Sequence, residues 1–164
     1  LPQGGALIAM KHQSALDTIV PSLFLPRPVY VYKKELGNVP VMGAYLKRNQ
    51  IGVDRGGHAK ALKSIVRGAR DAVAKGGQVL IFPEGTRVKV GTRAPLQSGF
   101  AGLYKLLGLP VVPVAVDSGR LYHRTWKRAG TITYRYGAPI PAGLPRDEIE
   151  ARVLAAINDL NTGA

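Results

Sequence analysis

The chain has 164 residues, of which 46% are hydrophobic, so we expect residues 1–164 to form a single globular domain with a substantial core. It contains no cysteine, which excludes disulfides, thiolate metal ligands and a cysteine nucleophile. Its 23 lysines and arginines outnumber 10 acidic residues and give a formal net charge of +13. That excess favours an anionic partner such as nucleic acid, anionic lipid, a phosphorylated substrate, CoA or an acidic carrier protein.

No apolar run approaches the ~18–20 residues that a transmembrane helix needs, and no signal peptide is visible. The sequence begins Leu1-Pro2, without an initiator methionine. We therefore expect this chain to be a fragment from which an N-terminal membrane segment is absent.

Apolar runs alternate with stretches of helical periodicity along the whole chain. We expect strands at 6–10, 28–34, 50–53, 78–82, 110–116 and 131–136, and helices at 14–24, 40–48, 57–75, 99–107 and 146–160. The two prolines of 110–116 suggest a strand end or an edge strand. Residues 83–98 show little periodicity, as in a functional or mobile loop. The alternation predicts an α/β fold with a mostly parallel central sheet flanked by helices on both faces.

Polar residues follow three of the predicted strands. His12 comes after the first strand, Asp54 and Arg55 after another, and residues 84–87 after a third. Ligands of open α/β sheets bind beyond the carboxyl ends of the strands. We therefore expect these three clusters to contribute to one site.

His12 and Asp17 form a plausible pair for proton transfer. A neutral imidazole can accept a proton, and a carboxylate bound to its other nitrogen orients it and stabilises the imidazolium. The sequence has neither a cysteine nor a GxSxG motif, so the nucleophile would belong to the substrate. The same spacing also fits a loop histidine followed by a first-turn aspartate that the helix dipole favours.

The segment FPEGTR, residues 82–87, has the composition of an anion-binding turn. Gly85 permits close backbone approach to a ligand, and Thr86 and Arg87 can bind phosphate oxygens. Glu84 could orient a cation or a substrate hydroxyl. The alternative is a polar loop in which Glu84 pairs with Arg87.

Several other polar residues allow two interpretations. Trp126 lies in a basic cluster and fits either a membrane interface or ordinary packing. His58 and His123 lack metal-ligand spacing, so we expect surface histidines and no metal site. The helix 57–75 carries a basic stripe that is either a solvated face or part of an anion-binding surface: Lys60, Lys63, Arg67 and Arg70.

Four blocks of the sequence together resemble the glycerolipid acyltransferases. KHQSALD (11–17) resembles their HxxxxD motif, and IGVDRG (51–56) is similar to their second block, GxxFIDR. FPEGTR (82–87) matches the third block at every position, and LPVVPVAV (109–116) resembles the proline-rich fourth. The resemblance is closest to bacterial members that convert lysophosphatidic acid to phosphatidic acid. Two positions depart from the pattern: Lys11 stands where many members have Asn, and Val53 replaces a bulky apolar residue.

The resemblance implies a role for each matching residue. His12 would deprotonate the acceptor hydroxyl and Asp17 would orient His12. The glycerol phosphate of the acceptor would be held by residues of the second and third blocks, namely Arg55, Glu84, Gly85, Thr86 and Arg87.

The resemblance also implies partners and location. The acyl donor would be acyl-CoA or acyl carrier protein, with no cofactor, no metal and no acyl-enzyme. The protein would associate with anionic membrane lipid at the cytoplasmic face of the bacterial inner membrane. Two alternatives stay open: a related acyltransferase for glycerol 3-phosphate, a lysophospholipid or an aminolipid, and a basic binding module without catalysis. No RNA- or DNA-reading motif is present, so we expect no nucleic-acid partner.

Overall fold

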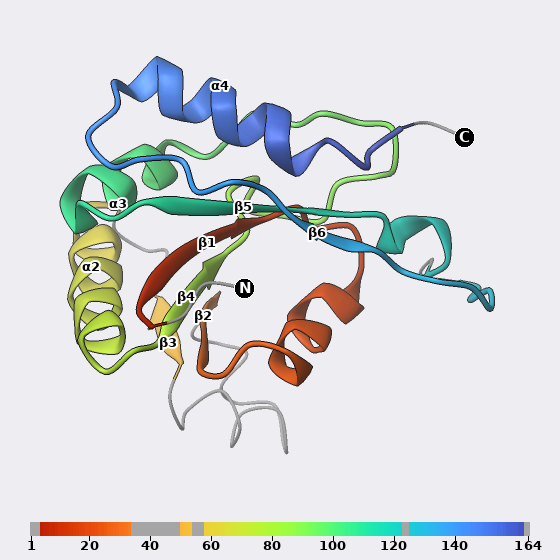
Figure 1. Cartoon of the computed structure of the whole chain (residues 1–164), viewed down its shortest axis with the longest axis horizontal. Coiled ribbons are helices and arrows are strands. Elements are labelled where there is room, and N and C mark those ends of the chain that lie inside the picture. Colours follow the sequence, from red (N-terminus) through yellow and green to blue (C-terminus); the bar gives the residue numbers. More distant parts are fainter. Residues whose placement is uncertain (1–3, 34–49, 54–57, 123–124, 163–164) are drawn as a thin grey trace.

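The computed structural model describes residues 4–33, 50–53, 58–122 and 125–162 (Figure 1). A six-stranded sheet has the strand order β3-β2-β4-β1-β5-β6. The first five strands run parallel and β6 runs antiparallel to β5, which confirms the expected mostly parallel sheet flanked by helices. The strands are β1 Ala6–Met10, β2 Pro28–Lys33, β3 Ile51–Val53, β4 Gln78–Ile81, β5 Val111–Val116 and β6 Tyr134–Tyr136. The α-helices are α2 His58–Ala74, α3 Ser98–Leu107 and α4 Arg146–Ile157.

The central strand β1 is buried along its whole length. Ile8 lies beside Leu80 of β4 on one side and Val112 of β5 on the other. Parallel strands that are covered on both faces are mostly apolar, as ALIAM, VVPVAV and, after Gln78, the strand QVLI are. Because β1, β4 and β5 are parallel, the residues that follow them meet at one edge of the sheet.

The two faces of the sheet are covered by different kinds of helix. The helices α2, α3 and α4 pack on the face that contains Leu7 and Ala9, and Figure 1 shows α4 lying over β5 and α2 beside β3. On the opposite face, which contains Ile8 and Met10, Leu25 joins the core at the end of a helical segment. Among the described residues, the helices on that second face are 3-10 helices.

The expectation of one helix at 14–24 was therefore wrong. The structure has two short 3-10 helices instead, η1 Ala15–Thr18 and η2 Val20–Leu23. Pro21 lacks the backbone N–H that an α-helix would need there, and its ring would clash with the preceding turn. The helix expected at 40–48 lies outside the described residues.

Of the two alternatives for the prolines of 110–116, a strand end fits Pro110, which directly precedes β5, whereas an edge strand is wrong because β5 lies between β1 and β6. Pro113 is tolerated in this interior strand because β5 pairs with β6 only beyond it, at 114–116. The N–H of Gly137 donates to the carbonyl of Pro113 at 2.9 Å, and a separate bridge joins Val111 to Ile140. The proline nitrogen thus faces a stretch where the regular ladder is interrupted, and no ladder hydrogen bond is lost.

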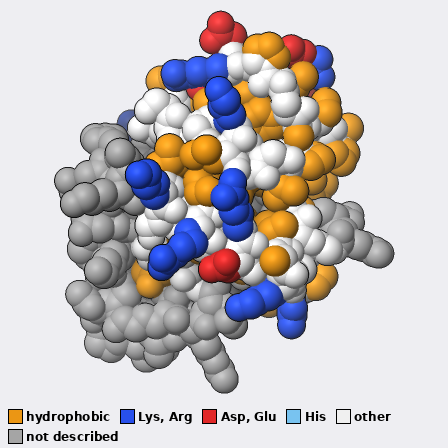
Figure 2. Space-filling view, turned by 90° about the vertical axis from the view of Figure 1, so that its left-hand side faces the viewer, with side chains coloured by type: hydrophobic (Ala, Val, Ile, Leu, Met, Phe, Trp, Pro, Cys, Tyr) orange, Lys and Arg blue, Asp and Glu red, His pale blue; other side chains and the backbone are white. Residues whose placement is uncertain are grey.

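Helix α2 confirms the amphipathic pattern of 57–75, with Val66 and Ala69 in the core. Lysine and arginine side chains gather on the outer surface that carries this helix (Figure 2). Arg70 of α2 donates to the carbonyl of Leu106 at 2.7 Å at the end of α3. No helix in the described part of the chain is both long and apolar enough to cross a membrane.

Helix α3 offers a matched pair of leucines that tests the packing. Leu103 is 3% exposed against the sheet, whereas Leu106 is 44% exposed. We expect Leu103→Ala to lower the free energy of unfolding by about 2–5 kcal/mol, because it leaves a cavity. Leu106→Ala should change it by less than about 1 kcal/mol. Urea titrations followed by circular dichroism measure both values, and equal losses would contradict this packing.

Candidate active site

His12 lies two residues after the end of β1 and beside the end of β4. Its ring stacks on Phe82, with ring centroids 4.0 Å apart and the planes 21° from parallel. The N–H of Val88 donates to the His12 carbonyl at 2.8 Å. The structure therefore brings together two of the three predicted strand-end clusters. The third cluster, Asp54 and Arg55, lies outside the described residues.

Asp17 is fully buried and faces His12. His12 Nδ1 lies 3.4 Å from Asp17 Oδ2, which also accepts the backbone N–H groups of Gln13 at 2.7 Å and Ser14 at 2.8 Å. The Ser14 and Tyr134 hydroxyls each lie 3.3 Å from Oδ1. When Nδ1 carries the proton that faces Asp17, the lone pair of the imidazole is on Nε2. This is the arrangement that a general base requires.

The surroundings of Asp17 favour its ionised form. Burial raises the pKa of its carboxyl, but hydrogen bonds from His12, Ser14 and Gln13 outweigh burial and leave the pKa below its ordinary value of 3.8. The Ser118 hydroxyl, which is buried and has no hydrogen-bond partner within the geometric limits in the described part of the chain, also lowers the pKa of Asp17. The carboxylate is therefore charged at neutral pH and can stabilise an imidazolium.

Tyr134, on β6, also favours the ionised form of Asp17. Burial raises the pKa of the Tyr134 hydroxyl, and the negative charge of Asp17 raises it further. The side chain thus stays protonated and can donate to the carboxylate. Sequence patterns alone did not single out Tyr134, because its contact with Asp17 depends on antiparallel pairing of β6 with β5.

The acid of the third block, Glu84, is buried. Glu84 does not pair with Arg87; its Oε1 lies 2.6 Å from Nζ of Lys11, and both side chains are fully buried. Thr86 and Arg87 are exposed beyond this turn. Gly85 has a φ of +74°, and a Cβ there would lie 2.7 Å from Cγ of Gln97. The turn therefore requires glycine at 85 and presents its hydroxyl and guanidinium outward.

Lys11 had no assigned role in the sequence and has an extensive one in the structure. Besides Glu84, its ammonium donates to Oδ1 of Asn158 at 2.9 Å and to the carbonyl of Thr92 at 3.1 Å. The alternation of side chains along β1 could have predicted that Lys11 is buried. It places Lys11 on the buried face of Leu7 and Ala9, where a charged group needs a partner.

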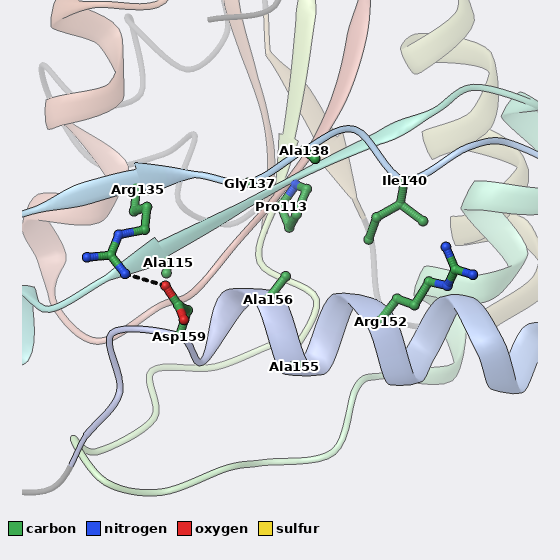
Figure 3. Close-up of a pocket in the computed structure, with 10 residues that line it drawn as sticks. All are labelled: Pro113, Ala115, Arg135, Gly137, Ala138, Ile140, Arg152, Ala155, Ala156 and Asp159. Atoms are coloured by element: carbon green, nitrogen blue, oxygen red, sulfur yellow. Dashed lines mark hydrogen bonds and ion pairs between the residues drawn. The ribbon is translucent and has the colours of Figure 1, made fainter.

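A groove of about 540 Å³ lies elsewhere, between β5, β6 and α4 (Figure 3). Pro113 and Ala115 line it, on the face of β5 opposite to Val112 and Val114. His12 continues the alternation of β1 on the face of Met10, which is the face of Val114. An ion pair between Arg135 and Asp159 borders the groove. The groove therefore does not adjoin the His12–Asp17 pair.

No group of three or more His, Cys, Asp or Glu side chains within the described ranges is arranged to hold a metal ion. The geometry consists of a histidine oriented by a buried carboxylate, next to an exposed threonine and arginine. These features place a candidate proton acceptor, Nε2 of His12, and an exposed cationic turn at the carboxyl edge of a parallel sheet.

The chain belongs to the acyltransferase family. The family described as "Acyltransferase" matches residues 1–117, a range that includes His12, Asp17, the turn 84–87 and all of β5.

Individual relatives agree with this assignment. The chain is 34% identical over 165 residues to a 1-acyl-sn-glycerol-3-phosphate acyltransferase of Pseudomonas aeruginosa, an alignment that covers 100% of this chain and 62% of the relative. It is 32% identical over 143 residues to the protein of that name from Cocos nucifera, covering 82% of this chain and 46% of the relative. The chain thus spans less than two thirds of the length of these relatives.

A solved structure has the same fold. The crystal structure of the 1-acyl-sn-glycerophosphate (LPA) acyltransferase PlsC from Thermotoga maritima superposes with a TM-score of 0.79 at 18% sequence identity. The match covers 98% of this chain and 66% of that protein.

The ionised state of Asp17 predicts a pH dependence of stability. A carboxyl whose pKa is lower in the folded than in the unfolded protein contributes stability that is complete above the unfolded value and is lost as pH falls through the folded value. We expect Asp17→Asn to lower the free energy of unfolding by about 1–3 kcal/mol at neutral pH. The difference from wild type should shrink between about pH 5 and about pH 3.

Asp71→Asn, at an exposed position on α2, is the matched control and should show little difference at any pH. Urea unfolding at a series of pH values measures both variants. A gap between wild type and Asp17→Asn that stays constant down to about pH 3 would contradict a lowered pKa.

Proposed function

We propose that this chain is the acyltransferase domain of an enzyme that transfers a fatty acyl group from acyl-CoA or acyl carrier protein to the free hydroxyl of lysophosphatidic acid, giving phosphatidic acid. The observation that carries the proposal is the His12–Asp17 pair at 3.4 Å beside the turn 84–87. The names of the relatives support the choice of acceptor.

In the proposed reaction, Nε2 of His12 takes the proton of the acceptor hydroxyl while the oxygen attacks the thioester carbonyl. The C–O bond forms, the C–S bond breaks, and the departing thiolate takes the proton back from the imidazolium. Asp17 keeps its charge throughout and stabilises the imidazolium. Stacking on Phe82 restricts the plane of the ring. The absence of cysteine from the sequence supports direct transfer to the acceptor.

The proposed acceptor site lies beyond β4. Thr86 and Arg87 are exposed at the turn and would bind phosphate oxygens, with Gly85 allowing close approach and Arg55 contributing from the second block. Glu84 would act mainly by holding this turn through Lys11. Its other oxygen, Oε2, is buried without a partner among the described residues.

We place the reaction at an anionic membrane surface, on the cytoplasmic face of the bacterial inner membrane. The net charge of +13 favours such a surface. Four large apolar side chains of the described residues are exposed: Leu23 at 81%, Ile19 at 60%, Leu106 on α3 at 44% and Trp126 at 41%. Arg128 lies over the ring of Trp126, 4.7 Å from its centroid, which combines the cationic and aromatic character of membrane-interface residues.

Two other functions are less well supported. A different acceptor, such as glycerol 3-phosphate, a lysophospholipid or an aminolipid, would use the same base and is distinguished only by assay. A binding module without catalysis would not need a buried carboxylate that orients a histidine.

Substitution of His12 tests the catalytic role. We expect His12→Ala to reduce thiol release from acyl-CoA and lysophosphatidate by about 10²–10⁴-fold, because the acceptor loses its base. Asp17→Asn should also lower the rate, while Asp71→Asn should match wild type. The measurement is a thiol assay of purified protein with liposomes. Equal rates for wild type and His12→Ala would overturn the role of the base, and turnover with another acceptor alone would change the proposed substrate.

Vesicle binding tests the membrane proposal separately. We expect sedimentation with anionic vesicles to decrease as salt rises and to be several-fold weaker for Trp126→Ala than for wild type. Leu106→Ala, exposed on α3, is the control and should bind like wild type. Binding that is independent of salt and equal for neutral vesicles would count against an electrostatic association.

A further inference from the structure

The end of helix α4 reaches the residues on both sides of His12. Asn158 and Asn161 follow the last turn of this helix and are only 3% and 7% exposed. Both lie beyond residue 117, where the match to the acyltransferase family ends. The family resemblance therefore assigns them no role.

Asn161 uses its whole hydrogen-bonding capacity. Its Oδ1 accepts from Gln13 Nε2 at 3.0 Å and from the N–H of Gly91 at 2.8 Å. Its Nδ2 donates to the carbonyl of Thr92 at 2.7 Å and to Oδ1 of Asn158 at 2.8 Å. A side-chain amide has two donor hydrogens and one acceptor oxygen with two lone pairs, and all are occupied. An aspartate of the same shape could not donate to Thr92 or Asn158.

Asn158 connects this amide to the buried ion pair. Its Oδ1 accepts from Nζ of Lys11 at 2.9 Å as well as from Asn161, and its Nδ2 donates to the carbonyl of Leu154 at 2.8 Å within α4. Lys11 in turn holds Glu84 at the start of the turn 84–87. The helix thus contacts the acid of the third block through one lysine.

Gln13 completes the connection on the other side of His12. Its Oε1 accepts the N–H of Gly119 at 3.1 Å, while its own backbone N–H donates to Asp17 at 2.7 Å. A shift of Gln13 would therefore move a donor of the carboxylate that orients the imidazole. Lys11 and Gln13 flank His12 in sequence, and each donates to one of the two asparagines.

We propose that Asn158 and Asn161 are positioning residues, which fix His12 against Asp17 and against the turn 84–87 by holding both sequence neighbours of His12. The inference rests on the proposed function for its kinetic consequence, but not for its structural one. Reacting groups must be placed to within a fraction of an ångström, and buried hydrogen-bond networks provide such placement.

Asn161→Asp is the variant that tests the proposal most sharply. It keeps the shape of the side chain and removes the two donated hydrogen bonds. We expect kcat to fall by about 10–100-fold, with the KM for acyl-CoA within about threefold of wild type. Asp159→Asn is the matched control: it is the reverse exchange two positions away, at an exposed side chain that pairs with Arg135, and should leave kcat unchanged.

Nuclear magnetic resonance of the histidine ring supplies a readout that a loss of stability alone would not move. The ring N–H proton of His12, assigned by its absence in His12→Ala, should broaden or shift in folded Asn161→Asp and stay in place in Asp159→Asn. A folded Asn161→Asp protein with the wild-type ring resonance and wild-type kcat would overturn the proposal.

Gln13→Ala removes the hydrogen bond from the Gln13 amide to Asn161. It is the deciding variant if Asn161→Asp does not fold. An unchanged ring resonance in Gln13→Ala would then overturn the proposal, and a displaced one would support it. If wild type itself releases no thiol with any acceptor, the proposed function fails. In that case the His12 ring resonance of the variants still shows whether Asn158 and Asn161 position the imidazole.

Discussion

Nζ of Lys11 and Oε1 of Glu84 lie 2.6 Å apart with both side chains completely buried, at the carboxyl ends of two neighbouring strands. Removing either partner would leave an uncompensated charge in the core, which typically costs about 3–5 kcal/mol. The pair therefore fixes the turn after β4 relative to the end of β1. Because side chains alternate along a strand, the next residue, His12, points to the other face and meets Phe82 there.

The other face has the opposite electrostatic arrangement. Asp17 is as deeply buried as Glu84, but no lysine or arginine of the described ranges pairs with it; polar hydrogens from Gln13, Ser14 and Tyr134 surround it instead. Such a carboxylate stays ionised and keeps its attraction for a proton on His12. The end of β1 thus has a buried ion pair on one face and, on the other, a histidine beside a carboxylate that polar hydrogens stabilise.

Local sequence predicted the parts of the fold that depend on local physics. Apolar runs located β1, β4 and β5, and the helical period located α2, because burial on one or both faces leaves its period in the chain. The same reasoning missed Pro21 as the reason for two 3-10 helices in place of one α-helix. It took the two prolines of 110–116 as a sign of a strand end or an edge; Pro110 does precede β5, but β5 is an interior strand, and the interruption of β6 pairing lets it keep Pro113.

The site was predictable only as far as its strand ends. His12 and residues 84–87 were expected to lie at one edge because parallel strands end there; the ends of β1 and β4 do meet, His12 through Phe82 and Lys11 through Glu84. The partner of Glu84 was not found, since Lys11 is 73 positions away, and neither was Asn158, which is 147 positions from Lys11. Buried polar contacts between distant residues leave no periodic signal, so only the packed structure reveals them.

In the proposed reaction His12 activates the acceptor, and no group of the protein becomes acylated. The most direct measurement mixes the protein with acyl-CoA in the absence of acceptor, quenches rapidly, and records both thiol release and the mass of the intact chain. Direct transfer predicts no stoichiometric burst of thiol and an unchanged mass until lysophosphatidate is added. A burst of about one thiol per chain together with an acylated protein would contradict it, because it would show a covalent intermediate.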